Sequence, residues 1–222
     1  MIQLATTKTL VSFTTESLQR LSASFKAEHH LILPQIIEPQ LLEIISQRLK
    51  AANFRPRVYK GLGRDLCPDD IRTAALLSFL CNRRKLLEFI EALTGCGHLG
   101  SFLGKVYRIE PGQNHYDSWH DDVIDDRKIA LSINLTEKPY SGGILEIRES
   151  GSKRVLNSVT NTGFGDAIIF PISDELEHRR TTVFGGVPKT AFAGWFKSKP
   201  DFSESLRQTR KATPTPCQRS IP

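Results

Sequence analysis

The stretch from Tyr107 to Asp122 reads YRIEPGQNHYDSWHDD and ends in a histidine followed by two aspartates. We expect its last part, residues 118–123, to form a short β-strand. Residues i and i+2 of a strand leave the same face, so His120 and Asp122 would point together while Asp121 points away. The pattern therefore selects Asp122 over its neighbour as the partner of His120.

A second histidine, His178, begins another β-like run, HRRTTVFGG, 58 residues after His120. Two imidazoles and one carboxylate on one face of a metal ion form the facial triad of non-haem Fe(II) sites, which leaves the remaining positions open for other ligands. The sequence therefore predicts His120, Asp122 and His178 as metal ligands and as the catalytic centre.

Seven short motifs follow one another in the order that a known family uses, over roughly residues 100–197. They are YRIEPG (107–112), WHDD (119–122), LSINL (131–135), SGGILEI (141–147), GDAIIF (165–170), LEH (176–178) and PKTAFAGWF (188–196). In these motifs the chain resembles the Fe(II)/2-oxoglutarate-dependent dioxygenases, and among them the prolyl-hydroxylase-like group.

The resemblance implies an α+β fold with a mainly β core, a double-stranded β-helix (jelly roll, cupin-like) buttressed by N-terminal helices. Short runs separated by Gly, Pro, Asn and Asp are typical of such antiparallel cores. We expect strands at 102–110, 118–123, 127–136, 143–149, 154–160, 166–171, 178–184 and 189–197. Residues 98–200 would be the catalytic core, 1–97 a helical support without independent stability, and 201–222 a basic, disordered tail.

Apolar periodicity and end signals predict helices in the N-terminal region. They are expected within 14–26, from Pro39 onward, after Pro68, and over 83–93, where Gly95 would end the last one. Residues 55–68, RPRVYKGLGRDLCP, are predicted to be a polar loop. Two interpretations of it stay open: a surface connection, or a mobile flap over the active site.

The family places a basic residue after the second histidine to bind the far carboxylate of 2-oxoglutarate. Here the resemblance assigns that role to Lys189, with Tyr107 as a helper because a lysine lacks the fork of an arginine. On a strand beginning at His178, Arg180 would share the face of the histidine and Arg179 would not. Asn134 matches a cavity-facing position of the family, with the capping of a turn as its alternative.

The reaction implied by the resemblance is oxidative decarboxylation of 2-oxoglutarate to succinate and CO2, coupled to hydroxylation of an unactivated C–H bond. Fe(II), 2-oxoglutarate and O2 would be required, with ascorbate as a candidate stimulant. Asp122 favours hydroxylation over halogenation, because family halogenases lack this carboxylate. The substrate would be amino-acid-like, a natural product, or a side chain of a protein. A cupin-like binding protein and a metal-dependent hydrolase or isomerase are the alternatives.

Composition adds few constraints to this interpretation. The net charge of the 222 residues is +6, but residues 197–222 alone carry six basic and two acidic side chains, so the rest is nearly neutral. We therefore expect no nucleic-acid partner. Cys67, Cys81, Cys96 and Cys217 have no zinc or disulfide spacing. The N-terminus lacks a signal peptide pattern and no stretch is long and apolar enough to span a membrane, which predicts a cytoplasmic protein.

Overall fold

A seven-stranded antiparallel sheet forms the centre of the protein, as seen in a computed structural model that describes residues 2–112 and 114–202. The predicted tail falls almost wholly on 203–222, outside the described residues. The strand order is β3-β11-β7-β14-β6-β5-β4. The bounds of these strands are Leu31–Leu33 (β3), Ala167–Pro171 (β11), Arg127–Asn134 (β7), Lys189–Lys197 (β14), Ser101–Ile109 (β6), Gly63–Pro68 (β5) and Phe54–Tyr59 (β4).

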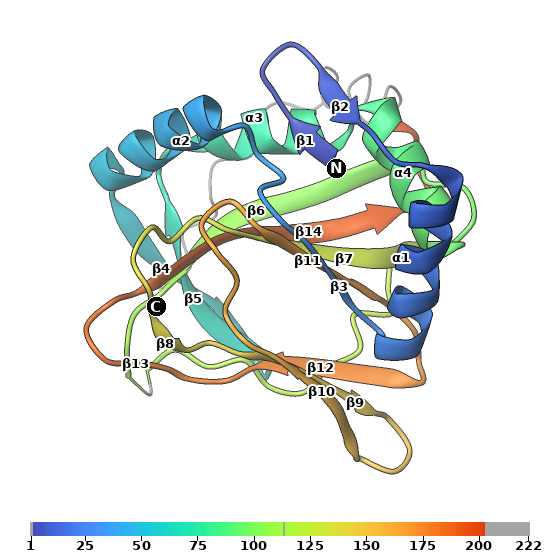
Figure 1. The fold of residues 1–222 in the computed structure, drawn as a ribbon. Helices are drawn as coiled ribbons and strands as arrows, with labels where there is room; N and C mark the ends of the chain where they lie inside the picture. Colours follow the sequence, from blue (N-terminus) through green and yellow to red (C-terminus); the bar gives the residue numbers. More distant parts are fainter. Residues whose placement is uncertain (1, 113, 203–222) are drawn as a thin grey trace.

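A smaller sheet lies below the large one in Figure 1, with the order β10-β9-β12. Its strands are Val155–Val159 (β10), Leu145–Glu149 (β9) and Leu176–Arg180 (β12), and a short pair joins Ser141–Gly142 (β8) to Val183–Phe184 (β13). Apolar side chains from both sheets, Ala130, Ile147, Val159, Ile168 and Phe170, pack into a cluster between them. The two sheets form the predicted double-stranded β-helix, although the expected strand 178–184 is divided between β12 and β13.

Four helices cover the face of the large sheet that is turned away from the small one (Figure 1). They are Thr15–Glu28 (α1), Pro39–Ala51 (α2), Ile71–Cys81 (α3) and Arg84–Thr94 (α4), and a hairpin of Ile2–Leu4 (β1) and Thr9–Val11 (β2) lies beside them. Phe192 and Phe196 of β14 are fully buried in the same apolar cluster as the helices. Helices and sheet therefore share one core.

The helix ends follow local sequence signals. The Thr14 side chain accepts a hydrogen bond from the backbone N–H of Ser17 at the start of α1, and Asp70 caps α3 in the same manner. Gly95, with φ of 68°, ends α4 in the left-handed conformation that glycine adopts without strain. These signals explain why the four predicted helices were placed correctly. None of the helices in the described part of the chain is long and apolar enough to cross a membrane.

The predicted loop at 55–68 is instead a β-hairpin, formed by β4 and β5 at the edge of the large sheet. Arg57 lies directly opposite Asp65 and donates two hydrogen bonds to its carboxylate, at 2.9 and 3.0 Å. A paired Arg and Asp on facing strands stabilises a hairpin whose sequence is otherwise poor in alternating apolar residues. The prediction of a loop was wrong because this pairing is not visible in local periodicity.

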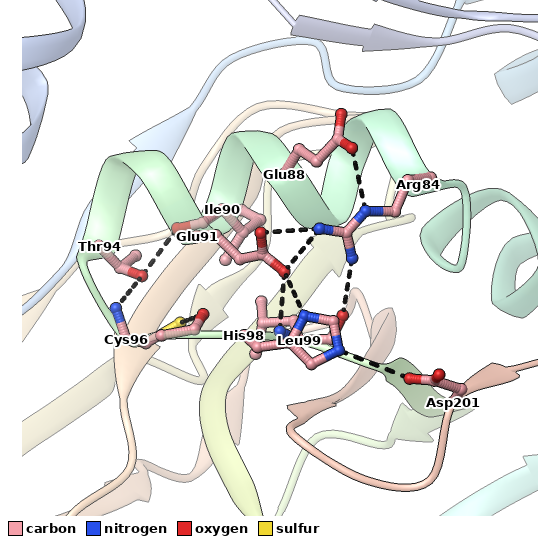
Figure 2. A network of polar contacts seen from close by, with 10 residues as sticks. Arg84, Glu88, Ile90, Glu91, Thr94, Cys96, His98, Leu99 and Asp201 are labelled. Atoms are coloured by element: carbon pink, nitrogen blue, oxygen red, sulfur yellow. Dashed lines mark hydrogen bonds and ion pairs between the residues drawn. The ribbon is translucent and has the colours of Figure 1, made fainter.

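The C-terminal half of α4 is tied to the start of β6 by polar contacts (Figure 2). Glu91 accepts a hydrogen bond from the backbone N–H of Leu99 at 2.8 Å and from Arg84 at 2.9 Å. Arg84 in turn donates to the Leu99 carbonyl at 3.1 Å. Glu88 binds the same arginine, but both of these side chains are half exposed.

We expect Glu91→Ala to lower the free energy of unfolding by about 1–3 kcal/mol, because the buried Leu99 N–H would lose its acceptor. Glu88→Ala is the matched control and should cost less than about 0.5 kcal/mol, as is usual for an exposed i, i+4 pair. Urea denaturation of both variants measures the difference. Equal effects of the two substitutions would contradict the assignment of Glu91 as the link between α4 and β6.

Candidate metal centre and its cavity

His120, Asp122 and His178 lie together at one end of a cavity between the two sheets. The Nε2 atoms of His120 and His178 lie 3.6 and 3.4 Å from Asp122 Oδ2. Two donors bound to one ion at about 2.1 Å are at most about 4.2 Å apart, so these separations suit a shared ion. The backbones of His120 and His178 also exchange two hydrogen bonds, at 3.1 and 2.8 Å.

The segment 118–123 is not the strand that the sequence predicted. Only His120 forms a bridge, and Asp122 has a φ of 60° in the left-handed region. The same-face rule for strands therefore does not explain why Asp122 meets the histidines. The backbone turns at Asp122, and Asp121 is left exposed with its carboxylate accepting from the Val123 N–H.

The carboxylate of Asp122 is held at both oxygens by side chains from the large sheet. Arg127 donates to Oδ1 at 2.9 Å, and the indole N–H of Trp195 donates to Oδ2 at 2.8 Å. The Arg127 guanidinium also stacks 3.7 Å from the Trp195 ring centre. Burial disfavours the charged carboxylate, but its contacts with the two histidines outweigh this and lower the pKa of Asp122. The structure thus presents a fixed, ionised carboxylate.

The two imidazoles are oriented differently. Nδ1 of His120 lies 2.6 Å from the Ser118 carbonyl, which fixes the ring and leaves Nε2 facing Asp122. Burial opposes its charge, yet the contacts with Asp122 and Ser118 raise the pKa of His120 to about 9. His178 is more deeply buried, and burial lowers its pKa. The buried His178, the oriented His120 and the fixed carboxylate of Asp122 together match the donor set that a facial triad requires.

The cavity has a volume of about 190 Å³ and is lined by both sheets and by the β4–β5 hairpin. Lys189 lies at the start of β14 and is only 8% exposed. Its Nζ donates to the Gly143 carbonyl at 2.6 Å, and the Tyr140 ring centre lies 5.4 Å away. Burial, and then the charge of Arg180, lower the pKa of Lys189 to about 7.

Arg180 and Tyr107 lie together in the cavity wall. The guanidinium is 4.7 Å from the Tyr107 ring centre and 3.7 Å from the carboxylate of Asp117. Burial opposes the charge of Arg180, but Tyr107 and Asp117 outweigh it and raise its pKa. Arg179 points to the other face of β12, where it binds Glu146 at 2.7 Å. Alternation along the strand therefore separates the two arginines as predicted.

Asn134 does not line this cavity. Its amide donates to the carbonyls of Thr162 and Gly163 at 2.8 and 3.2 Å, and its carbonyl accepts from the Thr136 N–H at 3.0 Å. It borders a much smaller space next to Lys189. The contacts are those of the turn-capping alternative.

Sequence reasoning missed several residues of the cavity wall, notably Trp195 and Lys105. It left the role of the 55–68 segment open, and the hairpin residues that line the cavity are Tyr59, Leu62, Gly63, Arg64 and Asp65. Trp195 is six residues from Lys189 on one strand and therefore shares its face. The same alternation relates Lys105 to Tyr107 on β6. No comparable signal marks Arg127, whose contact with Asp122 depends on the turn at that residue.

Comparison with protein families matches residues 104–197 to the 2OG-Fe(II) oxygenase superfamily. Comparison with curated protein sequences gives no match. Among solved structures, a prolyl-4-hydroxylase from Pseudomonas putida has a TM-score of 0.61 at 16% identity, over 82% of this chain and 100% of that chain.

Two further structures have the same fold. A Trichoplax adhaerens prolyl hydroxylase in complex with a hypoxia inducible factor peptide fragment has a TM-score of 0.59 at 14% identity, over 89% of this chain and 97% of that chain. The α-ketoglutarate-dependent epimerase SnoN from nogalamycin biosynthesis has a TM-score of 0.60 at 13% identity, over 82% of this chain and 83% of that chain. Residues 104–197 thus match the 2OG-Fe(II) oxygenase superfamily, and the fold of the chain is like that of the prolyl hydroxylases.

Proposed function

We propose that the protein is a non-haem Fe(II)- and 2-oxoglutarate-dependent hydroxylase that acts on an unactivated C–H bond of a small amino-acid-like molecule, a natural product or a protein side chain. The observation that carries this proposal is the convergence of His120, Asp122 and His178 at one end of a cavity that has a buried cation, Lys189, at its other end. A metal and a dianionic cosubstrate need these two features together.

His120, Asp122 and His178 would hold Fe(II), and Arg127 and Trp195 would keep the Asp122 carboxylate in position. Bound Fe(II) would supply the activation of O2, with 2-oxoglutarate decarboxylated to succinate and CO2 and one oxygen atom inserted into the C–H bond of the substrate. Phe170 packs edge-on against His178 at 4.7 Å and helps to keep water from this side of the centre.

Lys189 would bind the far carboxylate of 2-oxoglutarate. Its ammonium is a point charge without the fork of a guanidinium, so other donors must orient the carboxylate. Arg180 and Tyr107 line the same cavity and are suited to that role or to a contact with the substrate. Asn134 would act at a distance, through the turn that it caps beside Lys189.

Hydroxylation is the outcome that a complete triad favours, because the carboxylate of Asp122 leaves no vacant ligand position for a halide. The fold itself does not decide the outcome, since an epimerase and prolyl hydroxylases share it. Ascorbate would stimulate turnover by keeping the metal reduced. A cupin-like binding protein would bind metal without consuming 2-oxoglutarate, and a hydrolase or isomerase would not need O2.

Replacement of Asp122, compared with replacement of its exposed neighbour Asp121, tests whether Asp122 belongs to the metal centre. We expect Asp122→Ala to reduce succinate formation from 2-oxoglutarate more than about a hundredfold, since loss of a ligand should exceed the roughly 10- to 100-fold cost of losing an outer contact. Asp121→Ala is the matched control, because Asp121 is exposed and should leave the rate near that of the wild type. The assay contains Fe(II), ascorbate, O2 and 2-oxoglutarate, and circular dichroism verifies folding. Succinate formation that persists in Asp122→Ala would disprove the proposed centre.

Lys189 gives the binding of 2-oxoglutarate a pH dependence. With a pKa of about 7 in the free protein, Lys189 loses its charge as the pH rises through 7, while a bound anion favours the charged form. Affinity for N-oxalylglycine in the Mn(II)-loaded protein should therefore fall by up to about tenfold per pH unit above 7, with uptake of a proton on binding.

Calorimetry in buffers of different ionisation enthalpy measures this uptake. The charged groups that face Lys189 are Arg180 and Asp117, and the guanidinium of Arg180 does not lose its proton in this range. Lys189→Arg should abolish the slope, because an arginine does not deprotonate, and Lys189→Met should lose most of the affinity. An unchanged slope in Lys189→Arg would transfer the role to another group.

Trp195 is expected to tune the metal through Asp122. Trp195→Phe keeps the ring but removes the N–H that binds Oδ2, so the affinity for Mn(II) should fall by about tenfold. Trp119→Phe is the matched control, since Trp119 stacks with Arg148 and Arg179 outside the cavity. Equal metal affinities of the two variants, measured by calorimetry, would show that the Trp195 hydrogen bond is irrelevant to the metal.

A further inference from the structure

A second cationic position lies in the cavity wall beside the β4–β5 hairpin. Lys105 of β6 lines the cavity, and its Nζ donates to the Tyr59 hydroxyl and lies 3.9 Å from the centre of the Tyr59 ring. Among residues 2–112 and 114–202, no carboxylate lies within ion-pair distance of Lys105. Burial, and then the charge of Arg57, lower the pKa of Lys105 to about 8. A partly desolvated ammonium of this kind lacks a counter-ion.

The carboxylates of the cavity wall cannot supply that counter-ion, because each one has a closer partner. Asp65 receives two hydrogen bonds from Arg57. Asp117 accepts from the backbone N–H of Arg180 at 3.0 Å. Asp122 is held by Arg127 and faces the two histidines. All three carboxylates of the cavity wall are therefore paired with groups other than Lys105.

Arg64 on the hairpin is a second donor in the same wall. It lines the cavity, and its Nε is buried with no hydrogen-bond partner among the described residues. Buried donors are nearly always paired, and leaving one unpaired costs about 1–3 kcal/mol. An unpaired Nε that lines the same cavity as an ammonium without an ion-pair partner indicates a site for an anion that comes from outside the protein.

The register of the strands separates this position from Lys189. On β14, Lys189 pairs with Ile109 of β6, whereas Lys105 pairs with Ala193. The pair that contains Lys189 and the pair that contains Lys105 are therefore four residues, or about 13 Å, apart along the strand. Trp195, which holds Asp122, lies only two residues beyond Ala193, or about 7 Å along the strand. Lys105 is thus near the metal end of the cavity and Lys189 near the far end.

We propose that the oxidised substrate carries a carboxylate, which binds Lys105 with Arg64 as second donor while an apolar part faces the metal centre. This inference deepens the proposed function and depends on it. Leu62, Leu145 and Ile168 line the same cavity and suit an aliphatic part next to the carboxylate. The carboxylate belongs either to a free amino-acid-like molecule or to an acidic side chain of a peptide, and the probes below distinguish these sources.

The test measures how probes stimulate consumption of 2-oxoglutarate by the Fe(II)-loaded full chain. The probes are the proteinogenic L-amino acids, their carboxamides, and the N-acetyl amides of aspartate and glutamate as peptide mimics. We expect free acids or side-chain acids to stimulate succinate formation, and the corresponding neutral amides to be at least about tenfold weaker, as for loss of a charge-assisted hydrogen bond. An amide as effective as its acid, or no response to any acid, overturns the inference.

Variants link the effect to the proposed position. Lys105→Met should raise the half-stimulating concentration of the effective acid by about tenfold or more, and Lys105→Arg should restore most of it, since the charge is regained. Lys128→Met, at an exposed position outside the cavity, is the matched control and should behave as the wild type. An unchanged half-stimulating concentration in Lys105→Met also overturns the inference.

A binding measurement distinguishes this failure from failure of the proposed function. Calorimetry of the Mn(II)-loaded protein with N-oxalylglycine reports on the 2-oxoglutarate position without turnover. Wild-type protein that binds N-oxalylglycine and forms succinate, but shows no dependence on Lys105, refutes only the carboxylate site. Wild-type protein that does neither refutes the oxygenase proposal, and the inference falls with it.

Discussion

Strand β14 is the constraint on which the rest of the structure depends, because β6 pairs with one of its edges along the whole strand and β7 pairs with the other edge from Ala191 to Lys197. Both edges are satisfied, so the two faces of the strand alone decide where its side chains lie. Phe192 is buried under the helices, while Lys189 and Trp195 face the cavity. The neighbouring strand β6 approaches Gly194 so closely that a Cβ added there would come within 2.1 Å of the Leu103 carbonyl oxygen. One strand thus fixes the positions of the core residue Phe192, of Lys189 and of Trp195, which supports Asp122, in a single register.

Features that depend on local chemistry could be predicted from the sequence. Caps and apolar periodicity placed the helices, as at Thr14 and Gly95, because a helix end is determined by residues within one turn. Strand alternation likewise placed Arg180 and Arg179 on opposite faces, because successive residues of a strand point to opposite sides of the sheet. The same rule would have assigned Lys105 and Trp195 to the cavity, had it been applied to β6 and β14.

Features that depend on distant partners could not be predicted in this way. Asp122 adopts a positive φ and is held by Arg127 and Trp195, and the second of these lies 73 residues away in the sequence. The hairpin of β4 and β5 contains two prolines and three arginines, and it is stabilised by the pairing of Asp65 with Arg57 across it. In both places tertiary contacts override a weak local preference. The strand rule that selected Asp122 therefore does not hold for its backbone, although its carboxylate does lie beside the two histidines.

The β4–β5 hairpin is connected to His120 by two hydrogen bonds in series. The carbonyl of Leu62, at the hairpin tip, accepts from the N–H of Ser118 at 2.8 Å, and the carbonyl of Ser118 contacts Nδ1 of His120 at 2.6 Å. A molecule that displaces the tip also displaces Ser118, and with it the imidazole. The orientation of the His120 imidazole therefore depends on the position of the hairpin tip.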